Sequence, residues 1–482
     1  MSKRNVSVAL LCLLAGAALN SFQCAPSDYS ALIDQGEFNR AARIIQEKFE
    51  DDPNLSAEEQ LQLEFELERM DRIRKDFTQS RDDLMEFINL YIPDATEADF
   101  RKWEDSRALE YMLIDGEKKY FKNAQYNLFR IDKDARAIKA QKDSVDGTAK
   151  VKEFPLDEHI CSVIETARNS GMRNVKPVTL RIKQSITVNE NIVPEGEVIR
   201  AWIPFPREIQ NRQGNIHILS TSGPDYIIAD NDRYLQRTIY FQQKASKNEA
   251  AEFFIEYEYT VYGVYAPISA DRVRAITDES EFRAFLQVEP PHIVFTDELR
   301  ELSKTIVGDE RNPYLIAQKL FEWVDVNIPW ASAREYSTIR NLSMYPYINR
   351  HGDCGIQTLM FITLCRLNGI PAKWQSGWEF QPPDNSMHDW GEIYFEPFGW
   401  VPMDVTYGVR DTQDEAHKWF YVNGMDSYRL IFNDAISQEF FPAKTFPRSE
   451  TVDSQRGEVE WSGGNLYFDQ WDWNLEWEVI AE

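Results

Sequence analysis

Hydrophobic and polar positions divide the chain into stretches of different period. Residues 25–174 carry apolar side chains at three- and four-residue spacing, as in 38–49 and 57–77, which is typical of amphipathic helices. From 175 to 268 the apolar positions alternate with polar ones, and turn residues separate the runs, as expected for short half-buried strands. Helical spacing returns near residue 297, and the last seventy or so residues are again strand-like and aromatic.

This order predicts an α+β protein with several domains, which suits a chain of 482 residues. We expect a helical domain at 25–174, an antiparallel β-sandwich at 175–268 and a mixed α+β domain at 269–411. A C-terminal, aromatic-rich β segment at 412–482 should add strands to one of these domains.

The N-terminus has the pattern of an export signal. Lys3 and Arg4 precede an apolar run over 6–19, which is shorter than a transmembrane helix requires. We therefore expect a signal peptide at 1–24 and a mature protein in the periplasm or at the cell surface. Cys24 is the candidate for lipidation, although Ser21-Phe22-Gln23 lacks the small residues of a good lipobox.

Composition and charge exclude several classes of function. With 53 Lys and Arg against 79 Asp and Glu, the net charge of −26 excludes ordinary nucleic-acid binding and disfavours docking on anionic lipid, so a lipid anchor is the expected membrane contact. No zinc or calcium ligand spacing occurs, and we expect neither a metal nor a cofactor. The cysteines of the mature chain are scattered and do not predict a disulfide framework.

Cys354 stands at a predicted helix N-terminus. Gly352-Asp353 supply a turn and a cap, an apolar helix follows, and Asn368-Gly369-Ile370-Pro371 ends it. Free N–H groups and the helix dipole favour negative charge there, so we expect a lowered thiol pKa and a nucleophilic thiolate. Cys365 lies on nearly the same stripe of this helix, roughly 16 Å away, and is expected to be a buried structural residue.

Downstream, His388 and Asp404 lie on two predicted strands joined by a turn at 397–399. Folding about that turn brings them close enough for the carboxylate to hold the imidazole tautomer. A cysteine, a histidine and an aspartate in this arrangement are sufficient for nucleophilic acyl transfer. These three residues are our candidate catalytic set.

Four blocks closely resemble the transglutaminase-like cysteine enzyme superfamily: GDC (352–354), GIPAKWQSGW (369–378), HDWGEIYF (388–395) and GWVPMDVTYG (399–408). The resemblance covers about residues 297–411. It implies a papain-like α+β core with Cys354 as nucleophile, His388 as base and acid, and Asp404 as the residue that orients His388. The sandwich before this core is similar to the β domain of bacterial members.

Comparison with the family also singles out Trp330 and Asp389. Members of the family commonly stabilise the oxyanion with an aromatic or amide side chain upstream of the cysteine, and Trp330 is the nearest candidate. Where the family often has a small residue after the histidine, this chain has Asp389, which we expect to raise the pKa of His388.

The expected reaction is acyl transfer from an amide, either a peptide bond or a glutamine carboxamide, through a thioester. Hydrolysis of a peptide or protein substrate is favoured, and transamidation stays open. The alternative is a non-catalytic envelope scaffold or glycan-binding protein with a vestigial triad. It would use an alternating stripe that we interpret first as a core strand and second as a sugar-stacking platform: Trp471, Trp473, Leu475, Trp477 and Val479.

Overall fold

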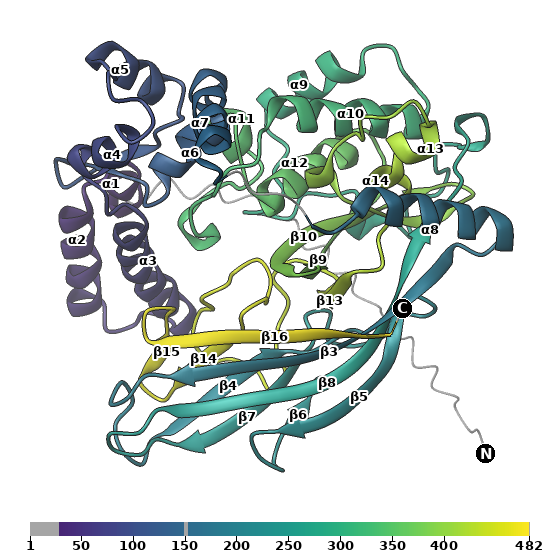
Figure 1. Ribbon diagram of the computed structural model, residues 1–482. Coiled ribbons are helices and arrows are strands. Elements are labelled where there is room, and N and C mark those ends of the chain that lie inside the picture. The colour runs from purple at the N-terminus through teal and green to yellow at the C-terminus, as the bar shows by residue number, and fades with distance from the viewer. Residues whose placement is uncertain (1–27, 149–152, 482) are drawn as a thin grey trace, which may run out of the picture.

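The computed structural model describes residues 28–148 and 153–481 (Figure 1). The predicted signal peptide and Cys24 lie outside these residues. Within the described ranges, no helix combines the length and the apolar character that crossing a bilayer requires. Helices fill the N-terminal part and antiparallel sheets recur through the rest, which confirms the predicted α+β class.

Helices dominate residues 28–146, and side-chain caps explain where several of them begin. Ser56, Ser80 and Thr96 each accept a hydrogen bond from the N–H three residues on, and the acidic side chain there reaches back. The buried faces share one apolar core. The helices are α1 (Asp28–Asp34), α2 (Phe38–Asp51), α3 (Ala57–Asp76), α4 (Arg81–Ile88), α5 (Glu97–Asp105), α6 (Ala124–Ile131) and α7 (Lys133–Asp146).

A hairpin interrupts this helical region, which the sequence analysis did not foresee. Strands β1 (Tyr111–Ile114) and β2 (Glu117–Tyr120) pair antiparallel around Asp115-Gly116. Both turn residues have positive φ, 49° and 88°, a conformation that Asp-Gly adopts more readily than most pairs. The hairpin adds a small two-stranded sheet to the N-terminal region.

Among the described strands, two five-stranded antiparallel sheets enclose a second core, as a β-sandwich does. One has the order β12-β8-β3-β16 with β5 beside β8, and the other has the order β15-β14-β4-β7-β6. C-terminal strands therefore join both sheets. The strands are β3 (Asn174–Val188), β4 (Val198–Pro204), β5 (Gln213–Thr221), β6 (Ile227–Ile228), β7 (Thr238–Lys244), β8 (Ala251–Tyr265), β12 (Gly424–Met425), β14 (Glu458–Trp461), β15 (Gly464–Leu466) and β16 (Trp471–Ala481).

The C-terminal aromatic stripe on β16 packs into the molecule. β16 runs antiparallel to β3 along most of its length (Figure 1). Trp471 is buried, Trp477 packs against Phe380 with ring centroids 4.9 Å apart, and Trp473 meets the edge of Trp378 at 5.6 Å while staying 39% exposed. The stripe thus contributes to the contact between the sandwich and the neighbouring α+β domain, as its interpretation as a core strand requires.

The α+β domain is built on a sheet of order β11-β10-β9-β13, with α12 packed on β9 and β10. Nearly all side chains of α12 are buried in a third core, which α8 also joins. The domain boundaries stay a prediction. The elements are α8 (Leu156–Ser170), α9 (Asp297–Val307), α10 (Pro313–Asn327), α11 (Tyr345–Asn349), α12 (Cys354–Leu367), α13 (Glu415–Lys418), α14 (Phe420–Asn423), β9 (Ala372–Gln381), β10 (Asp384–Phe395), β11 (Gly399–Met403) and β13 (Arg429–Asn433).

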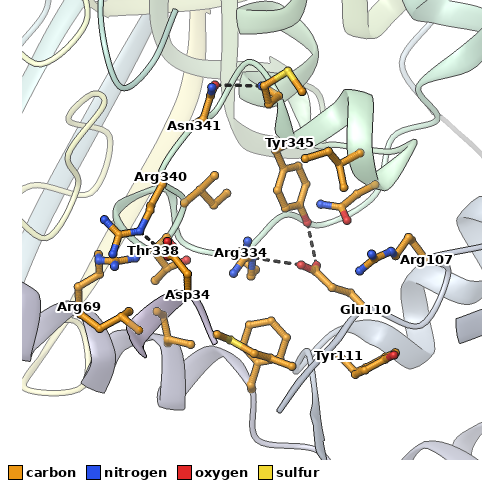
Figure 2. Close-up of a pocket in the computed structure, with 18 residues that line it drawn as sticks. Asp34, Arg69, Arg107, Glu110, Tyr111, Arg334, Thr338, Arg340, Asn341 and Tyr345 are labelled. Atoms are coloured by element: carbon orange, nitrogen blue, oxygen red, sulfur yellow. Dashed lines mark hydrogen bonds and ion pairs between the residues drawn. The ribbon is translucent and has the colours of Figure 1, made fainter. Parts of the chain in front are cut away.

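The N-terminal helices hold the segment 331–349, which precedes Cys354 in the chain. A cavity of about 400 Å³ lies at this contact (Figure 2). At its centre Glu110 accepts a hydrogen bond from Tyr345 Oη at 2.8 Å and pairs with Arg334 Nε at 3.1 Å. Nearby, the backbone N–H of Glu335 donates to Asp76 Oδ2 at 2.8 Å. The N-terminal region therefore fixes a loop of the α+β domain.

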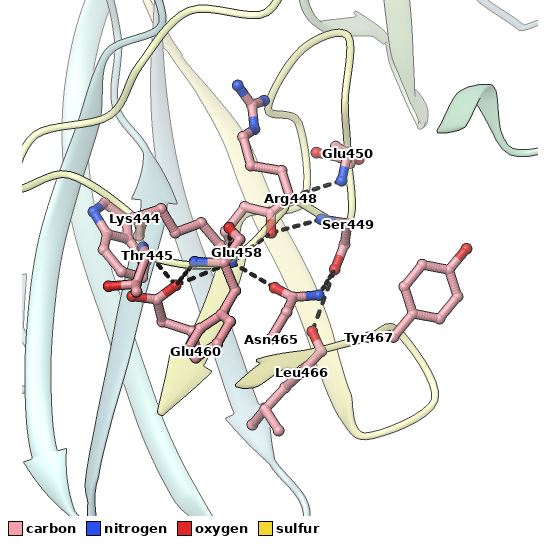
Figure 3. Close-up of polar contacts among 12 residues, drawn as sticks. Lys444, Thr445, Arg448, Ser449, Glu450, Glu458, Glu460, Asn465, Leu466 and Tyr467 are labelled. Carbon is pink, nitrogen blue, oxygen red and sulfur yellow. Dashed lines mark hydrogen bonds and ion pairs between the residues drawn. The ribbon is translucent and has the colours of Figure 1, made fainter. Parts of the chain in front are cut away.

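A buried polar network anchors the C-terminal segment on the sandwich (Figure 3). The carboxylate of Glu458 on β14 accepts hydrogen bonds from the N–H groups of Ser449 at 2.8 Å and Glu450 at 2.7 Å. Lys444 lies 3.7 Å from Glu458 and 3.4 Å from Glu460. Because these groups are buried, each needs its partner, and the network fixes the chain over 444–450.

We expect Glu458→Ala to lower the free energy of unfolding by about 2–4 kcal/mol, because two buried N–H donors lose their acceptor and Lys444 loses a counter-charge. Urea denaturation measures the change. Glu476→Ala is the matched control, since Glu476 is exposed on β16, and it should change stability by less than about 0.5 kcal/mol. Equal losses in both variants would contradict the structural role of Glu458.

Candidate active site

Cys354 is the first residue of α12, and its neighbours explain this position. The Asp353 side chain caps the helix by accepting a hydrogen bond from the N–H three residues on, at 3.1 Å. A Cβ on Gly355 would collide with the Tyr336 hydroxyl and the Asp389 carboxyl, so glycine allows both groups to approach. The residue is partly exposed and stands at a helix N-terminus, the position that the sequence predicts.

Strands β10 and β11 form the predicted hairpin and bring His388 to Asp404. The register pairs Gly391 with Met403, so the next step places Asp404 opposite Trp390, on the face that His388 shares. His388 Nε2 lies 2.7 Å from Asp404 Oδ2, and both side chains are buried. A carboxylate at this distance fixes the orientation of an imidazole and leaves its Nδ1 for another partner.

Arg429 on β13 completes a buried charge cluster around Asp404. Its Nη1 lies 2.8 Å from Asp404 Oδ2, and its Nη2 lies 2.7 Å from Asp426 Oδ2. Burial raises the pKa of Asp404, but His388 and Arg429 outweigh it, so that pKa is lowered. Burial lowers the pKa of His388, but Asp404 and Glu379 outweigh it, so that pKa is raised.

Asp389 faces the sulfur instead of the imidazole. Its Oδ2 lies 3.4 Å from Cys354 Sγ, and the groups that raise the pKa of His388 are Asp404 and Glu379. The expectation that Asp389 raises this pKa was therefore wrong. Asp389 directs its carboxyl to the sulfur at the start of α12, whereas His388 directs its Nε2 to Asp404.

The pKa of the Cys354 thiol is raised, whereas a helix N-terminus alone predicts that it is lowered. Burial has the largest effect, and the carboxyls of Asp389 and Asp353 add to it, because like charge disfavours a thiolate. Burial and the neighbouring Asp453 also raise the pKa of Asp389. The sulfur thus rests as a thiol beside a carboxyl group, and the described residues show no hydrogen bond between it and His388.

Comparison with known proteins agrees with this geometry. The sequence profile of the Transglutaminase-like superfamily matches residues 300–405, a span that includes Cys354, His388 and Asp404. The chain contains a transglutaminase-like domain. A search of curated proteins finds no match.

Solved structures show weaker likenesses. A provisionally assigned cysteine protease from Cytophaga hutchinsonii is 16% identical, with 64% of this chain and 93% of that chain covered and a TM-score of 0.40. The periplasmic domain of TgpA from Pseudomonas aeruginosa is 14% identical, with 48% and 88% covered and a TM-score of 0.26.

A C-terminal segment crosses the transglutaminase-like domain beside the candidate residues. The side-chain amide of Gln455 donates to the carbonyl of His388 at 3.0 Å and to Asp389 Oδ1 at 2.8 Å. The indole of Trp378 donates in turn to the carbonyl of Gln455 at 3.1 Å. No motif in the sequence marks this segment, and its part in the site follows from the fold alone.

Two aromatic residues upstream of Cys354 are candidates for the oxyanion site. Trp330, the residue chosen from the sequence, pairs through its backbone with Gly352, and its ring lies 4.6 Å from the guanidinium of Arg130. Its role stays a prediction. Tyr336, which sequence reasoning missed, donates a 2.7 Å hydrogen bond to Asp353 Oδ1. Tyr336 could have been found in the same way as Trp330, because it too is an aromatic residue upstream of Cys354.

The fold also assembles a second cysteine–histidine–aspartate chain on the surface. Cys161 Sγ lies 3.7 Å from His417 Nδ1, and His417 Nε2 lies 3.0 Å from Asp157 Oδ1. Cys161 sits inside α8 and not at its N-terminus, and burial together with nearby carboxylates raises its pKa. It therefore serves as a control for the chemistry of Cys354. Cys365 is buried, in agreement with its expected structural role.

We expect Asp404→Asn to lower the pKa of His388, because the amide removes the main charge that raises it. Titration of the imidazole resonances measures this change. A raised pKa in the folded state stabilises the protein below the unfolded value of about 6.5, and this stabilisation is lost as pH rises through the folded pKa. Asp404→Asn should therefore cost more stability at pH 6 than at pH 9. Asp157→Asn, beside His417, should leave His388 unchanged.

We expect Asp389→Asn to speed alkylation of Cys354 by a neutral reagent at pH 7–8, because it removes a carboxyl that disfavours the thiolate. Intact-mass measurement of labelling against pH, in a Cys161→Ser background, gives the rate at Cys354. Cys354→Ala identifies the residual signal. An unchanged or slower rate in Asp389→Asn would contradict the electrostatic effect assigned to this carboxyl.

Proposed function

We propose that the protein is an exported cysteine hydrolase that cleaves an amide bond of a peptide or protein through a thioester on Cys354. The observation that carries the proposal is the buried 2.7 Å contact between His388 and Asp404, on the strand whose next residue touches Cys354 Sγ. The match to the transglutaminase-like superfamily over the same span supports cysteine-based acyl transfer.

The first half of the reaction forms the thioester. The proton of the Cys354 thiol passes to His388, and the sulfur attacks the amide carbonyl to form a C–S bond. The raised pKa of the thiol means that this proton leaves as the substrate binds or reacts. Asp404 stabilises the imidazolium, and His388 then protonates the amine as the C–N bond breaks.

The second half resolves the thioester. His388 takes a proton from water, the hydroxide adds to the carbonyl, and the Cys354 sulfur leaves and regains its proton. The backbone N–H of Cys354 at the α12 N-terminus is suited to the oxyanion, with the Trp330 indole as the side-chain donor, because the Tyr336 hydroxyl already donates to Asp353. An amine in place of water would give transamidation. We favour water because the bacterial exported enzymes that this chain resembles look more like hydrolases.

Export belongs to the same proposal. The apolar run over 6–19 after Lys3 and Arg4 supports it, with Cys24 as the residue that would carry a lipid anchor. The alternative of a glycan-binding scaffold with a vestigial triad relied on the aromatic stripe of β16. We do not adopt it, because Trp471 is buried and Trp477 packs on Phe380.

We expect Cys354→Ala, His388→Ala and Asp404→Asn each to lower amide hydrolysis by roughly 10³–10⁴-fold, as removal of a member of such a triad does elsewhere. A library of peptide amides, read by mass spectrometry, measures release of the amine and the acid. Added glycine amide reports transamidation, because it would appear in the product. Cys161→Ala is the matched control and should keep full activity.

Full activity in Cys354→Ala would contradict the proposal, and so would loss of activity in Cys161→Ala alone. The acyl adduct provides a second measurement. Wild type treated briefly with substrate should carry the acyl group on Cys354, and hydroxylamine should release it. In Asp404→Asn the adduct should form more slowly, since the imidazole that accepts the thiol proton has lost its orienting partner.

A further inference from the structure

A pocket of about 140 Å³ lies one residue away from the candidate nucleophile, which is not itself part of the pocket lining. One of its walls is Asp389, whose carboxyl contacts Cys354 Sγ. The loop before α12 supplies another wall and the C-terminal segment a third. Its volume is several times the ~30 Å³ that one water occupies in the liquid. The pocket is thus large enough for a substrate group next to the attacked bond.

Carboxyl groups outnumber the cations that can neutralise them in this pocket. Four line it: Glu335, Asp389, Glu450 and Asp453. Of the three basic residues in its lining, Lys122 pairs with Asp76 at 2.8 Å and Arg334 with Glu110 at 3.1 Å, so both are neutralised by acids outside the pocket.

Arg456 remains, and two of the four acids already surround it. It lies 2.6 Å from Glu450 and 3.5 Å from Glu335. Glu450 also accepts hydrogen bonds from the N–H groups of Gln455 at 2.7 Å and Arg456 at 3.2 Å, so its carboxylate is fully engaged. The ion pairs of Arg456 are thus made with Glu450 and Glu335, and its charge acts on Asp453 only through space, as that of Arg448 does.

Asp453 supplies the observation that points to a ligand. Its side chain is only 5% exposed, it lines the pocket, and its Oδ2 has no hydrogen-bond partner among the described residues. Burial and the charge of Glu450 raise the pKa of this carboxyl, whereas hydrogen bonding with Asp389 and Ser376 lowers it, and Asp389 is itself an acid. A buried acceptor without a donor is costly, and a group with N–H donors and positive charge would satisfy it.

We propose that this pocket receives a primary ammonium group of the substrate, beside the amide that Cys354 attacks. The inference rests on the proposed function and adds the class of acyl donor: one with a lysine-like side chain or a free amino terminus close to the scissile bond. A primary ammonium carries three N–H donors, which suit the unpartnered Oδ2 of Asp453 and the carboxyl of Asp389.

Burial makes two of these carboxyl groups weaker acids than free carboxyls. Burial raises the pKa of Asp453 to about 6 and that of Glu335 to about 7, so without a cation these carboxyls bind protons between about pH 6 and 7. An entering ammonium would displace these protons. Binding of the ammonium group should therefore release protons into solution. A pair of carboxyls that only share a proton, and bind no cation, would not show this release.

Methanethiosulfonate reagents of different charge test the pocket through Cys354 itself, because each forms a disulfide with the sulfur and releases methanesulfinate. The probes are the aminoethyl, trimethylammonioethyl, sulfonatoethyl and neutral methyl reagents. Each charged reagent is compared with the neutral one, which cancels differences in thiol reactivity. Since the net charge of −26 attracts all cations, the same ratio at Cys161, measured in Cys354→Ala, serves as the baseline.

We expect the aminoethyl-to-neutral ratio at Cys354 to exceed that at Cys161 by about tenfold or more, and Asp453→Asn to remove most of this excess. The trimethylammonioethyl reagent should gain less, because it has charge but no N–H donor. Glu301→Gln removes an equal charge from an exposed site on α9 and should change nothing. Equal ratios at both cysteines, or an unchanged ratio in Asp453→Asn, would overturn the proposal.

If Cys354 reacts with none of the reagents, calorimetry of lysine amide binding to Cys354→Ala in buffers of different ionisation enthalpy decides. Proton release that Asp453→Asn abolishes supports the site, and absence of binding overturns it. Neither measurement needs catalysis, so failure here is distinguishable from failure of the proposed function. In an active enzyme, matched amides with lysine or acetyl-lysine, and with free or acetylated amino termini, identify which source supplies the ammonium.

Discussion

The carboxylate of Asp404, buried between the imidazole of His388 and the guanidinium of Arg429, is the interaction on which the candidate site depends. A buried charge without a partner costs several kcal/mol. Removing any one of these three side chains would leave a buried charge on another without its partner. The three side chains come from β10, from the end of β11 and from β13. Satisfying Asp404 therefore constrains the relative positions of three strands, and with them the edge of the sheet against which α12 presents Cys354.

Much of this arrangement could be predicted from local sequence. The turn Gly352-Asp353 and the stop at 368–371 define the helix that carries Cys354, and the turn at 397–399 defines the hairpin that joins His388 to Asp404. Local signals are sufficient in these cases because each contact is made within one supersecondary unit. The hairpin at Asp115-Gly116 was not predicted, although Asp-Gly is a strong sequence signal for a two-residue β-turn. The helical periodicity on both sides of this dipeptide obscured the turn.

Other parts of the site depend on contacts between distant segments, which no periodicity encodes. Arg429 and Gln455 carry no motif, and they reach the site because β13 pairs with β9 and because the buried network around Glu458 fixes the C-terminal segment. The direction of Asp389 could have been derived from strand alternation, since it follows His388 directly. The raised pKa of the Cys354 thiol could not have been derived from the sequence. It results from the opposing effects of the helix dipole, burial and two carboxyl groups, and only the packed structure shows the burial and the position of these carboxyls.

The effects that set the thiol pKa of Cys354 connect the carboxyl-lined pocket to the reactivity of the sulfur. Asp389 belongs to both, because it lines the pocket and lies 3.4 Å from Cys354 Sγ. The negative charge that disfavours the thiolate is therefore the same charge that would attract an ammonium group. A cation bound between Asp389 and Asp453 would offset that charge and lower the thiol pKa while the substrate is in place. A thiol that is protonated at rest and becomes acidic on binding would be protected from adventitious alkylation and oxidation, which matters for a Cys354 residue that is partly exposed.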